Sequence, residues 1–295
     1  MNPELLSHLS AVIRDATHRP FEVRDATPVG GGSINEAYRL EGTDGARYFL
    51  KLNDVRYLPI FIAEAAGLDA IAATNTLRMP RPIVHGSANA HSFLVLEHLE
   101  LGSCGDARLL GERLAALHRF TNEEFGFAQD NFIGTTPQPN GWKDSWMDFW
   151  REQRLGFQLR LAAQHGYGSQ LQTLGEKLLD ALHAFFAGYA PQPALLHGDL
   201  WSGNHAFLAD GTPVIFDPAP YYGDRECDLA MTELFGGYPA DFYAAYRAAY
   251  PLDAGYAVRK DLYNLYHVLN HANLFGGGYA MQAEQMMQRL LAEVG

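Results

Sequence analysis

The stretch Leu-Leu-His-Gly-Asp-Leu-Trp-Ser-Gly-Asn, residues 195–204, decides which fold this chain of 295 residues is expected to adopt. Here Asp199 is followed five residues later by Asn204. An apolar run then ends in Asp217, which lies thirteen residues after Asn204. Phosphoryl transfer from a nucleotide needs a carboxylate that orients and deprotonates the attacking hydroxyl, and amide and carboxylate oxygens that hold Mg²⁺. The pattern therefore predicts Asp199 as the base and Asn204 and Asp217 as metal ligands. The alternative, a polar loop that only caps helices, accounts less well for all three residues together.

A second group of candidate residues lies nearer the N-terminus. Glycines allow backbone N–H groups to approach phosphates without interference from a Cβ, although a glycine run also suits a mobile hairpin tip. The stretch in question joins two predicted strands and consists of Gly30, Gly31, Gly32 and Ser33. Lys51 lies in an apolar strand pattern, and Glu64 follows thirteen residues later in a predicted helix. Because a buried lysine is costly unless it is paired, we expect Lys51 to pair with Glu64 and to contact nucleotide phosphates.

The strand pattern that ends near residue 97 is expected to lead into a hinge. The backbone of Glu97 and Leu99 is predicted to contact an adenine there. Two other nucleotide-binding motifs, the Walker-type P-loop and the G-x-G-x-x-G dinucleotide fingerprint, do not occur in the sequence.

The order of the predicted elements indicates two lobes, with nucleotide binding assigned to residues 1–100 and catalysis and substrate binding to residues 101–295. The first lobe is expected to hold helices at 3–17 and 59–73, strands at 21–29, 34–40, 48–52 and 92–99, and a hairpin turn at 42–45. The second is expected to hold helices at 105–120, 142–164, 168–189, 228–235, 240–250 and 258–275, and short strands at 206–208 and 214–216. A β-rich lobe followed by a helical lobe is an α+β arrangement, not a doubly wound sheet.

Composition limits the classes of function. Hydrophobic residues make up 47% of the chain, which excludes extended disorder, and the net charge of -12 disfavours a general nucleic-acid binder. Residues 98–295 carry most of the negative charge, which either attracts cationic substrates or only solvates the surface. No apolar stretch is long enough to span a membrane, and no signal peptide is recognisable. We expect a cytoplasmic monomer that binds neither nucleic acid nor membrane.

The order of glycine turn, strand lysine, helix glutamate, H-x-D-x4-N and strand aspartate resembles the protein-kinase-like superfamily. Three stretches, residues 197–204, 215–237 and 262–279, are similar to the fructosamine-kinase, or ketosamine-3-kinase, family, and the resemblance extends from about residue 21 to residue 279. The first stretch alone would also fit aminoglycoside, choline or homoserine kinases.

The resemblance implies a bilobal kinase-like fold that binds ATP and Mg²⁺ in the cleft between a small and a large lobe. It implies phosphorylation of the 3-hydroxyl of ketosamines, the sugar adducts of amines and of protein lysines, after which the unstable adduct is lost and the amine is repaired. Trp201 and His271 are then expected to line the sugar pocket; the alternatives are that Trp201 only anchors its loop in the core and that His271 is a packed helix histidine. Some family members carry a cysteine where this chain has Ser33, so a disulfide-linked dimer is not expected.

Two alternative functions stay open at this point: a kinase for another cationic hydroxyl compound, such as an aminoglycoside or choline, and a nucleotide-binding regulator without turnover. His267 and His271, four residues apart in a predicted helix, lack the neighbouring glutamate of a zinc protease motif, so zinc binding is not expected. The charged run that follows Asp217 either locks the metal loop or forms an ordinary helix N-terminus. We favour the helix N-terminus for Glu226 and leave Asp228 open.

Overall fold

The computed structural model describes residues 1–30 and 34–295. The chain forms two compact units, Met1–Asp106 with Ala206–Asp217 (unit 1) and Ala107–His205 with Pro218–Gly295 (unit 2). Unit 1 is built around an antiparallel sheet and unit 2 is mostly helical, so the predicted α+β class is confirmed. None of the helices within the described residues is long and apolar enough to cross a membrane.

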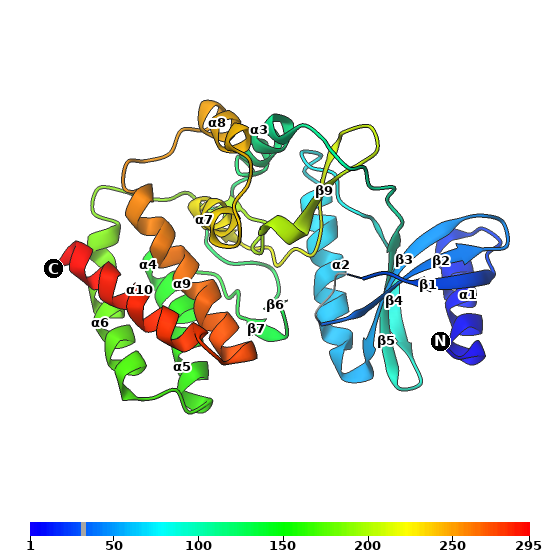
Figure 1. The fold of residues 1–295 in the computed structure, drawn as a ribbon, viewed down its shortest axis with the longest axis horizontal. Coiled ribbons are helices and arrows are strands. Elements are labelled where there is room, and N and C mark those ends of the chain that lie inside the picture. The colour runs from blue at the N-terminus through cyan, green and yellow to red at the C-terminus, as the bar shows by residue number, and fades with distance from the viewer. Residues whose placement is uncertain (31–33) are drawn as a thin grey trace. The chain divides into compact units, whose positions relative to one another are not determined.

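Unit 1 contains a five-stranded antiparallel sheet in the order β1-β2-β3-β5-β4. Its strands are β1 (Val23–Pro28), β2 (Glu36–Gly42), β3 (Arg47–Asp54), β4 (Pro82–Ala88) and β5 (His91–Glu97). Its helices are α1 (Pro3–Thr17), a 3-10 turn (Val55–Tyr57) and α2 (Leu58–Ala72), and Figure 1 shows α1 and α2 on opposite sides of the sheet. Because side chains alternate along a strand, Leu50 and Leu52 of β3 pack against the α1 side while Lys51 points toward α2.

The turn between β2 and β3 forms where the sequence predicts it. The Gly42 N–H donates to the Ala46 carbonyl at 2.8 Å, and the Gly45 N–H donates to the Gly42 carbonyl at 3.0 Å. Gly45 has a φ of +80°, a left-handed conformation that glycine adopts without strain. The resulting register pairs Ala37 with Lys51 and fixes the lysine's position along β3.

Strand β4 is not among the elements that the sequence predicts, because Pro80 and Pro82 interrupt the strand pattern there. Pro82 is the first residue of β4, and β4 is the edge strand of the sheet. A proline is tolerated at the start of an edge strand, since its missing N–H removes no bond from the interior of the sheet.

A short hairpin, β9 (His205–Phe207) and β10 (Pro213–Ile215), forms close to the two predicted strands near residues 206–216. The Gly102 N–H donates to the Phe207 carbonyl at 2.7 Å, and the Ile215 N–H donates to the Arg78 carbonyl at 3.0 Å. These bonds join residues 206–217 to unit 1, and Asp217 is therefore the last residue of a segment that packs with Lys51.

Unit 2 contains eight α-helices within the described residues, along with short irregular elements. The helices are α3 (Ala107–Leu117), α4 (Trp146–Phe149), α5 (Gly156–Gln164), α6 (Ser169–Phe185), α7 (Glu226–Leu234), α8 (Ala240–Ala249), α9 (Tyr256–Phe275) and α10 (Tyr279–Val294). The shorter elements are β6 (Asn131–Ile133), β7 (Thr136–Gln138), β8 (Ala194–Leu195), β11 (Tyr222–Gly223), a π-helical turn (Trp150–Leu155) and a 3-10 turn (Ser202–Asn204).

Two features of unit 2 differ from the predicted elements. The helix expected over 142–164 begins only at Trp146 and passes through a π-helical turn, in which the fully buried Arg154 lies 4.0 Å from the centre of the Tyr221 ring. Helix α10 was not predicted, although Ala283, Met286 and Leu290 are buried at helical spacing. Figure 1 shows α10 in red beside α9 in orange, and this contact buries the apolar face of α10.

Helix α3 approaches α8 closely at Gly111. A Cβ added at this glycine would overlap the carbonyl oxygen of Phe242, so only glycine fits between the two backbones. We expect Gly111→Ala to lower the free energy of unfolding by about 1–3 kcal/mol, because the overlap outweighs the better helix propensity of alanine. Urea unfolding measures this change.

The control is Glu112→Ala, an exposed site on the same helix, which is expected to change stability by less than about 0.5 kcal/mol. A Gly111→Ala variant more stable than the original chain would show that α3 and α8 can separate without cost.

Candidate kinase site

In unit 1, a buried lysine holds two carboxylates. Lys51 Nζ donates to Glu64 Oε1 at 2.6 Å and to Asp217 Oδ1 at 2.5 Å. The lysine lies on strand β3 and Glu64 on helix α2, and Asp217 lies two residues after the end of β10. The predicted pairing of Lys51 with Glu64 is confirmed, and Asp217 joins the pair.

The surroundings keep Lys51 charged. Burial works to lower its pKa, but the charges of Asp217 and Glu64 outweigh burial and hold the pKa above its ordinary value. A fixed ammonium of this kind can bind phosphate oxygens, because the two carboxylates set its position and it stays protonated. Lys51 is therefore a protonated ammonium held between two carboxylates, and its contact with nucleotide phosphates stays a prediction.

Asp217 has an unusual backbone conformation. Its φ is +58°, in the left-handed region that few residues other than glycine adopt, although aspartate tolerates it better than most. About 46% of its side chain is exposed even though Oδ1 accepts a hydrogen bond from Lys51. The carboxylate is thus fixed on one side and accessible to a cation on the other.

The predicted glycine turn is described only in part. Gly31, Gly32 and Ser33 lie outside the described residues, and a Cβ added at Gly30 would meet no atom within 4 Å. A larger residue than glycine would therefore fit at position 30 without a steric overlap. Phosphate binding by this turn stays a prediction.

The two predicted adenine-contacting residues lie at the end of β5. The Glu97 side chain pairs with Arg78 at 2.5 Å and with Arg81 at 3.6 Å. Burial would raise the pKa of Glu97, but the two arginines and the Arg81 N–H hold it below its usual range. Because the carboxylate is engaged, only the backbone of Glu97 could contact a base, and Leu99, which is half-buried, follows two residues later. This adenine contact stays a prediction.

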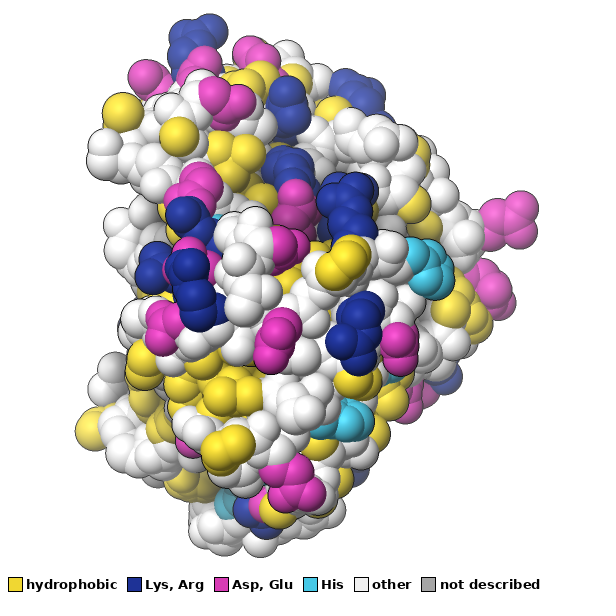
Figure 2. Space-filling model, turned by 90° about the vertical axis from the view of Figure 1, so that its right-hand side faces the viewer, with side chains coloured by type: hydrophobic (Ala, Val, Ile, Leu, Met, Phe, Trp, Pro, Cys, Tyr) yellow, Lys and Arg dark blue, Asp and Glu magenta, His cyan; other side chains and the backbone are white. Residues whose placement is uncertain are grey.

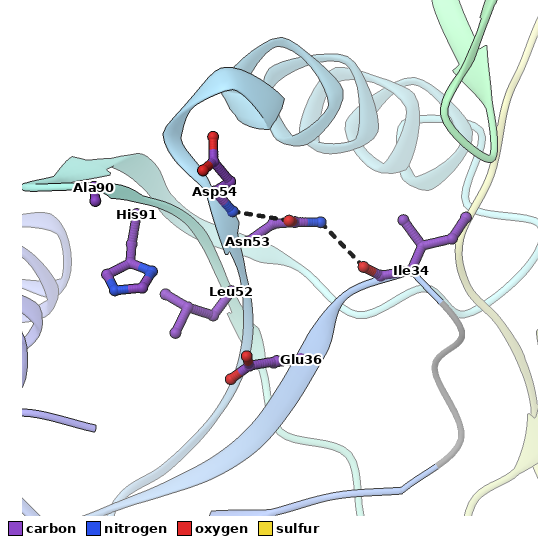
Figure 3. A pocket seen from close by; sticks show the side chains of 7 residues that line it. All are labelled: Ile34, Glu36, Leu52, Asn53, Asp54, Ala90 and His91. Atoms are coloured by element: carbon purple, nitrogen blue, oxygen red, sulfur yellow. Dashed lines mark hydrogen bonds between the residues drawn. The ribbon is translucent and has the colours of Figure 1, made fainter.

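A hollow of about 270 Å³ lies at the far end of β3, near its turn into α2, and Figure 3 shows the side chains around it. Asn53, two residues after Lys51, donates from Nδ2 to the Ile34 carbonyl at 3.1 Å and accepts from the Asp54 N–H at 2.8 Å. The hollow is lined by Ile34, Glu36, Leu52, Asn53, Asp54, Ala90 and His91. The predicted site residues are not among them.

In unit 2, the loop that follows β8 brings Asp199 and Asn204 together. Asn204 Nδ2 donates to the Asp199 carbonyl at 2.8 Å and to Asp199 Oδ2 at 3.3 Å. The 3-10 turn at Ser202–Asn204 makes this possible, since it reverses the chain after Trp201. The turn thus returns Asn204 to the same side of the loop as the Asp199 carboxylate.

Asp228, in the first turn of α7, holds the backbone of the same loop. Its Oδ2 accepts the His197 N–H at 2.7 Å and lies 3.1 Å from His118 Nε2, and its Oδ1 accepts the Gly198 N–H at 2.8 Å. Burial would raise the pKa of Asp228, but the hydrogen bonds and charges around it hold the pKa below its usual value. Asp228 therefore lies at a helix N-terminus, as one of the two interpretations has it, and the loop that it locks is the loop of Asp199, not the loop that follows Asp217.

Gly198 makes this anchoring possible. Its φ is +84°, and a Cβ there would overlap the carbonyl oxygen of Ala219.

Glu226, expected to mark a helix N-terminus, is the first residue of α7, but it is also fully buried and pairs with Arg259 at 2.8 Å. That ion pair was not predicted.

The two predicted sugar-contacting residues also belong to unit 2. The Trp201 side chain covers Gly203 and is 38% exposed. His271, on α9, is half-buried, and its Nδ1 lies 2.8 Å from the carbonyl of His267. The histidine Nδ1 is therefore the protonated nitrogen, and in the neutral ring Nε2 can accept a hydrogen bond.

The residues present fit Mg²⁺, an ion usually held by one or two carboxylates together with phosphates and water. Asp217 of unit 1 offers a half-exposed carboxylate, and Asn204 of unit 2 uses its amide nitrogen for Asp199, so that its oxygen is a candidate ligand. That the two residues hold one ion stays a prediction. Within residues 1–30 and 34–295, no cluster of three or more His, Cys, Asp or Glu side chains forms a metal site from protein ligands alone. An ion bound here would therefore depend on nucleotide phosphates for its remaining ligands.

The buried Lys–Glu pair with its aspartate, and the Asp-x4-Asn loop anchored by a buried carboxylate, define a phosphotransferase of the kinase-like class. The sequence profile of the fructosamine kinase family matches residues 5–293. The chain therefore belongs to the fructosamine kinase family.

Similar proteins support this assignment. A Synechocystis protein assigned as a ketoamine kinase is 51% identical over 283 residues, covering 95% of this chain and 94% of its own. A protein-ribulosamine 3-kinase, chloroplastic, from Oryza sativa subsp. indica is 41% identical, covering 92% of this chain and 80% of its own. A crystal structure from Haemophilus somnus, of a protein assigned as a fructosamine-3-kinase, has a TM-score of 0.87 at 30% identity and covers 96% of each chain. The predicted kinase-like fold is confirmed.

Asp228→Asn is expected to lower the free energy of unfolding by about 2 kcal/mol or more, because the new amide cannot accept both backbone N–H groups and one stays buried without a partner. Urea unfolding measures the loss. Asp180→Asn, exposed on α6, is the matched control and is expected to leave stability unchanged. Equal stability of the two variants would contradict the anchoring role.

His267 gives a prediction for pH dependence. Burial, reinforced by His271, lowers the pKa of His267 to about 3, whereas an unfolded histidine has a pKa of 6.5. Below pH 6.5 the unfolded chain therefore binds a proton that the folded chain does not, so stability falls as the pH falls. Between pH 7 and pH 5 this contributes a loss of about 2 kcal/mol.

His267→Gln is expected to remove that part of the loss, measured by urea unfolding at the two pH values. The control is His165→Gln, which is exposed and is expected to keep the full loss. An identical pH dependence in the original chain and His267→Gln would show that His267 protonates in the folded state.

Proposed function

We propose that this protein is an ATP-dependent kinase that phosphorylates the 3-hydroxyl of ketosamines, including ribulosamine and fructosamine adducts of protein lysines. Membership of the fructosamine kinase family supports the class of reaction. The names of the relatives, ketoamine kinase and protein-ribulosamine 3-kinase, support the class of substrate. The single observation that carries the proposal in this chain is the pairing of Asp199 with Asn204 on a loop fixed by Asp228.

In this proposal, Asp199 orients the sugar hydroxyl and accepts its proton as the hydroxyl oxygen attacks the γ-phosphorus. The bond from phosphorus to the β–γ bridging oxygen breaks, so ADP leaves and a phosphate ester forms. Such reactions depend mainly on positioning and on charge stabilisation. The Asn204 amide, 3.3 Å from Asp199 Oδ2, restrains the carboxylate so that it meets the hydroxyl in a fixed orientation.

Residues of unit 1 are assigned to the nucleotide. Lys51 would bind its α- and β-phosphates, with Glu64 holding the ammonium in place. The turn at residues 30–33 would cover the phosphates, and the backbone of Glu97 and Leu99 would contact adenine. Asn204 and Asp217 would hold Mg²⁺, which when bound neutralises the charge of the phosphates.

Trp201 and His271 are assigned to the sugar. The exposed Trp201 ring offers an apolar face for the C–H groups of the substrate, and His271 Nε2 can accept a hydrogen bond from a sugar hydroxyl. Phosphorylation makes the adduct unstable, so its loss restores the amine. Deglycation repair in the cytoplasm, by a monomer, is part of the same proposal.

The acidic character of residues 98–295 would favour a substrate that carries a protonated amine. By contrast, Figure 2 shows a face on which basic and acidic side chains are interspersed, so the excess of negative charge does not dominate everywhere. Because such an attraction acts on binding, substrate charge should affect KM more than kcat.

Asp199→Asn is expected to lower kcat on a ketosamine by about 10²–10⁴-fold, because the amide cannot accept the hydroxyl proton. ATP binding, measured by calorimetry, should stay the same because Asp199 is not assigned to the nucleotide. The assay is ADP release from Mg²⁺-ATP with ribulose- and fructose-lysine, kanamycin and choline as acceptors. Asp180→Asn serves as the control and should keep full activity.

Turnover only on kanamycin or choline would keep the kinase and reject the ketosamine. A chain that binds ATP and phosphorylates none of the four acceptors would instead indicate a regulator. Wild-type rates in Asp199→Asn would overturn the assignment of the base.

A further inference from the structure

Two similar turns end two helices of unit 2. Phe-Gly-Gly-Tyr, residues 235–238, follows α7, and Phe-Gly-Gly-Gly-Tyr, residues 275–279, joins α9 to α10. Gly236 and Gly237 have φ values of +93° and +73°, and those of Gly276 and Gly277 are +67° and +64°. Since other residues adopt this conformation only with strain, the glycines end each helix sharply and leave an aromatic ring on either side.

Rings from both turns meet at His271. The centre of its ring lies 4.9 Å from that of Phe235, 5.5 Å from that of Phe275 and 5.1 Å from that of Tyr279. We call these four residues the aromatic wall. Phe275 is 57% exposed and the other three are half-buried, so the wall has an open face.

The aromatic wall is joined to the loop that carries Asp199. Ser202 Oγ donates to the Phe235 carbonyl at 3.0 Å, and Ser202 lies only three residues after Asp199. In addition, the Tyr238 hydroxyl donates to the Trp201 carbonyl at 3.1 Å, so the first glycine turn is bonded to the loop at two points. The backbone of Phe235, one of the four wall residues, is therefore fixed to the loop.

Single exposed aromatic residues are common on protein surfaces, but several touching rings with an open face mark a binding site. Aromatic faces bind two kinds of group well: apolar C–H surface and organic ammonium ions. None of the four wall residues is a Lys or Arg that would repel a cation, and residues 98–295 carry an excess of negative charge. The wall is therefore suited to a cationic group with an alkyl chain.

We infer that the aromatic wall binds the amine substituent of the ketosamine, that is, the alkyl chain attached to its nitrogen. This inference rests on the proposed function. The hydroxyl on C-3 must reach Asp199, and the nitrogen on C-1 is only two carbons away, so its substituent begins close to the loop. Phe235 and His271 would contact the part next to the nitrogen, and the more exposed Phe275 the part further out. A lysine side chain has this shape, with a nitrogen followed by four methylene groups.

The inference makes the wall a determinant of specificity. The protein should prefer ketosamines whose nitrogen carries a long alkyl chain over those whose nitrogen carries a methyl group. Loss of a ring should affect the first kind of substrate more than the second, because only the long chain reaches the outer ring.

The test compares fructose adducts of hexylamine and of methylamine, assayed by ADP release with Mg²⁺-ATP. The measured quantity is the ratio of kcat/KM for the hexylamine adduct to kcat/KM for the methylamine adduct. Phe275→Ala is expected to lower this ratio about tenfold, mainly through the KM of the hexylamine adduct. The control is Phe120→Ala, which removes an equally large ring that is 43% exposed elsewhere on unit 2 and should leave the ratio unchanged.

Thermal unfolding of both variants verifies that they are folded. Phe235→Leu provides a second measurement, since it keeps apolar volume and the Ser202 bond to the backbone carbonyl while removing the ring; the ratio should fall here too. An unchanged ratio in both wall variants, or equal losses on the two adducts, would overturn the inference while leaving the kinase intact. Failure of the unaltered protein to phosphorylate either adduct or ribulose-lysine would overturn the proposed function instead.

Discussion

The carboxylate of Asp228 is the constraint on which the loop of Asp199 depends. It lies in the first turn of α7 and is buried, and it accepts hydrogen bonds from two consecutive backbone N–H groups, those of His197 and Gly198. A buried charge is costly unless it is fully hydrogen-bonded, and here the peptide groups and His118 supply the partners. The chain directly before Asp199 is therefore held in one conformation. At position 198 only a glycine can adopt that conformation without overlapping the Ala219 carbonyl.

Unit 1 uses the same physical principle with the opposite charge. Lys51 is buried, and it stays protonated because Glu64 and Asp217 both accept its hydrogen bonds. Replacing such a group with an apolar side chain could make a protein more stable, so its presence is better explained by chemistry than by stability. Both units thus place buried charge beside the residues assigned to phosphoryl transfer.

Local spacing in the sequence predicted a large part of this arrangement. The pairing of Lys51 with Glu64 is predictable because a buried strand lysine needs a partner, and Asp199 and Asn204 are recognisable as one motif because only four residues separate them. Other features could not be predicted in this way. Strand β4 is not predicted because it begins with a proline. Helix α10 is not among the predicted helices, although its buried apolar residues recur at helical spacing. The pairing of Glu226 with Arg259 joins residues 33 positions apart, and no local pattern indicates it.

The sequence by itself determined the family to which the chain belongs. It also determined the candidate residues for the chemistry, with Asp199 and Asn204 in one short motif and Lys51 in its strand. These depend on local spacing, because hydrogen bonding and side-chain alternation act over a few residues. Only the tertiary structure decided that Asp217 pairs with Lys51, 166 residues away, and that three rings from three helix ends meet at His271. The reason is physical: such contacts depend on how strands and helices pack, and packing brings together residues whose separation along the chain carries no information about their distance in space.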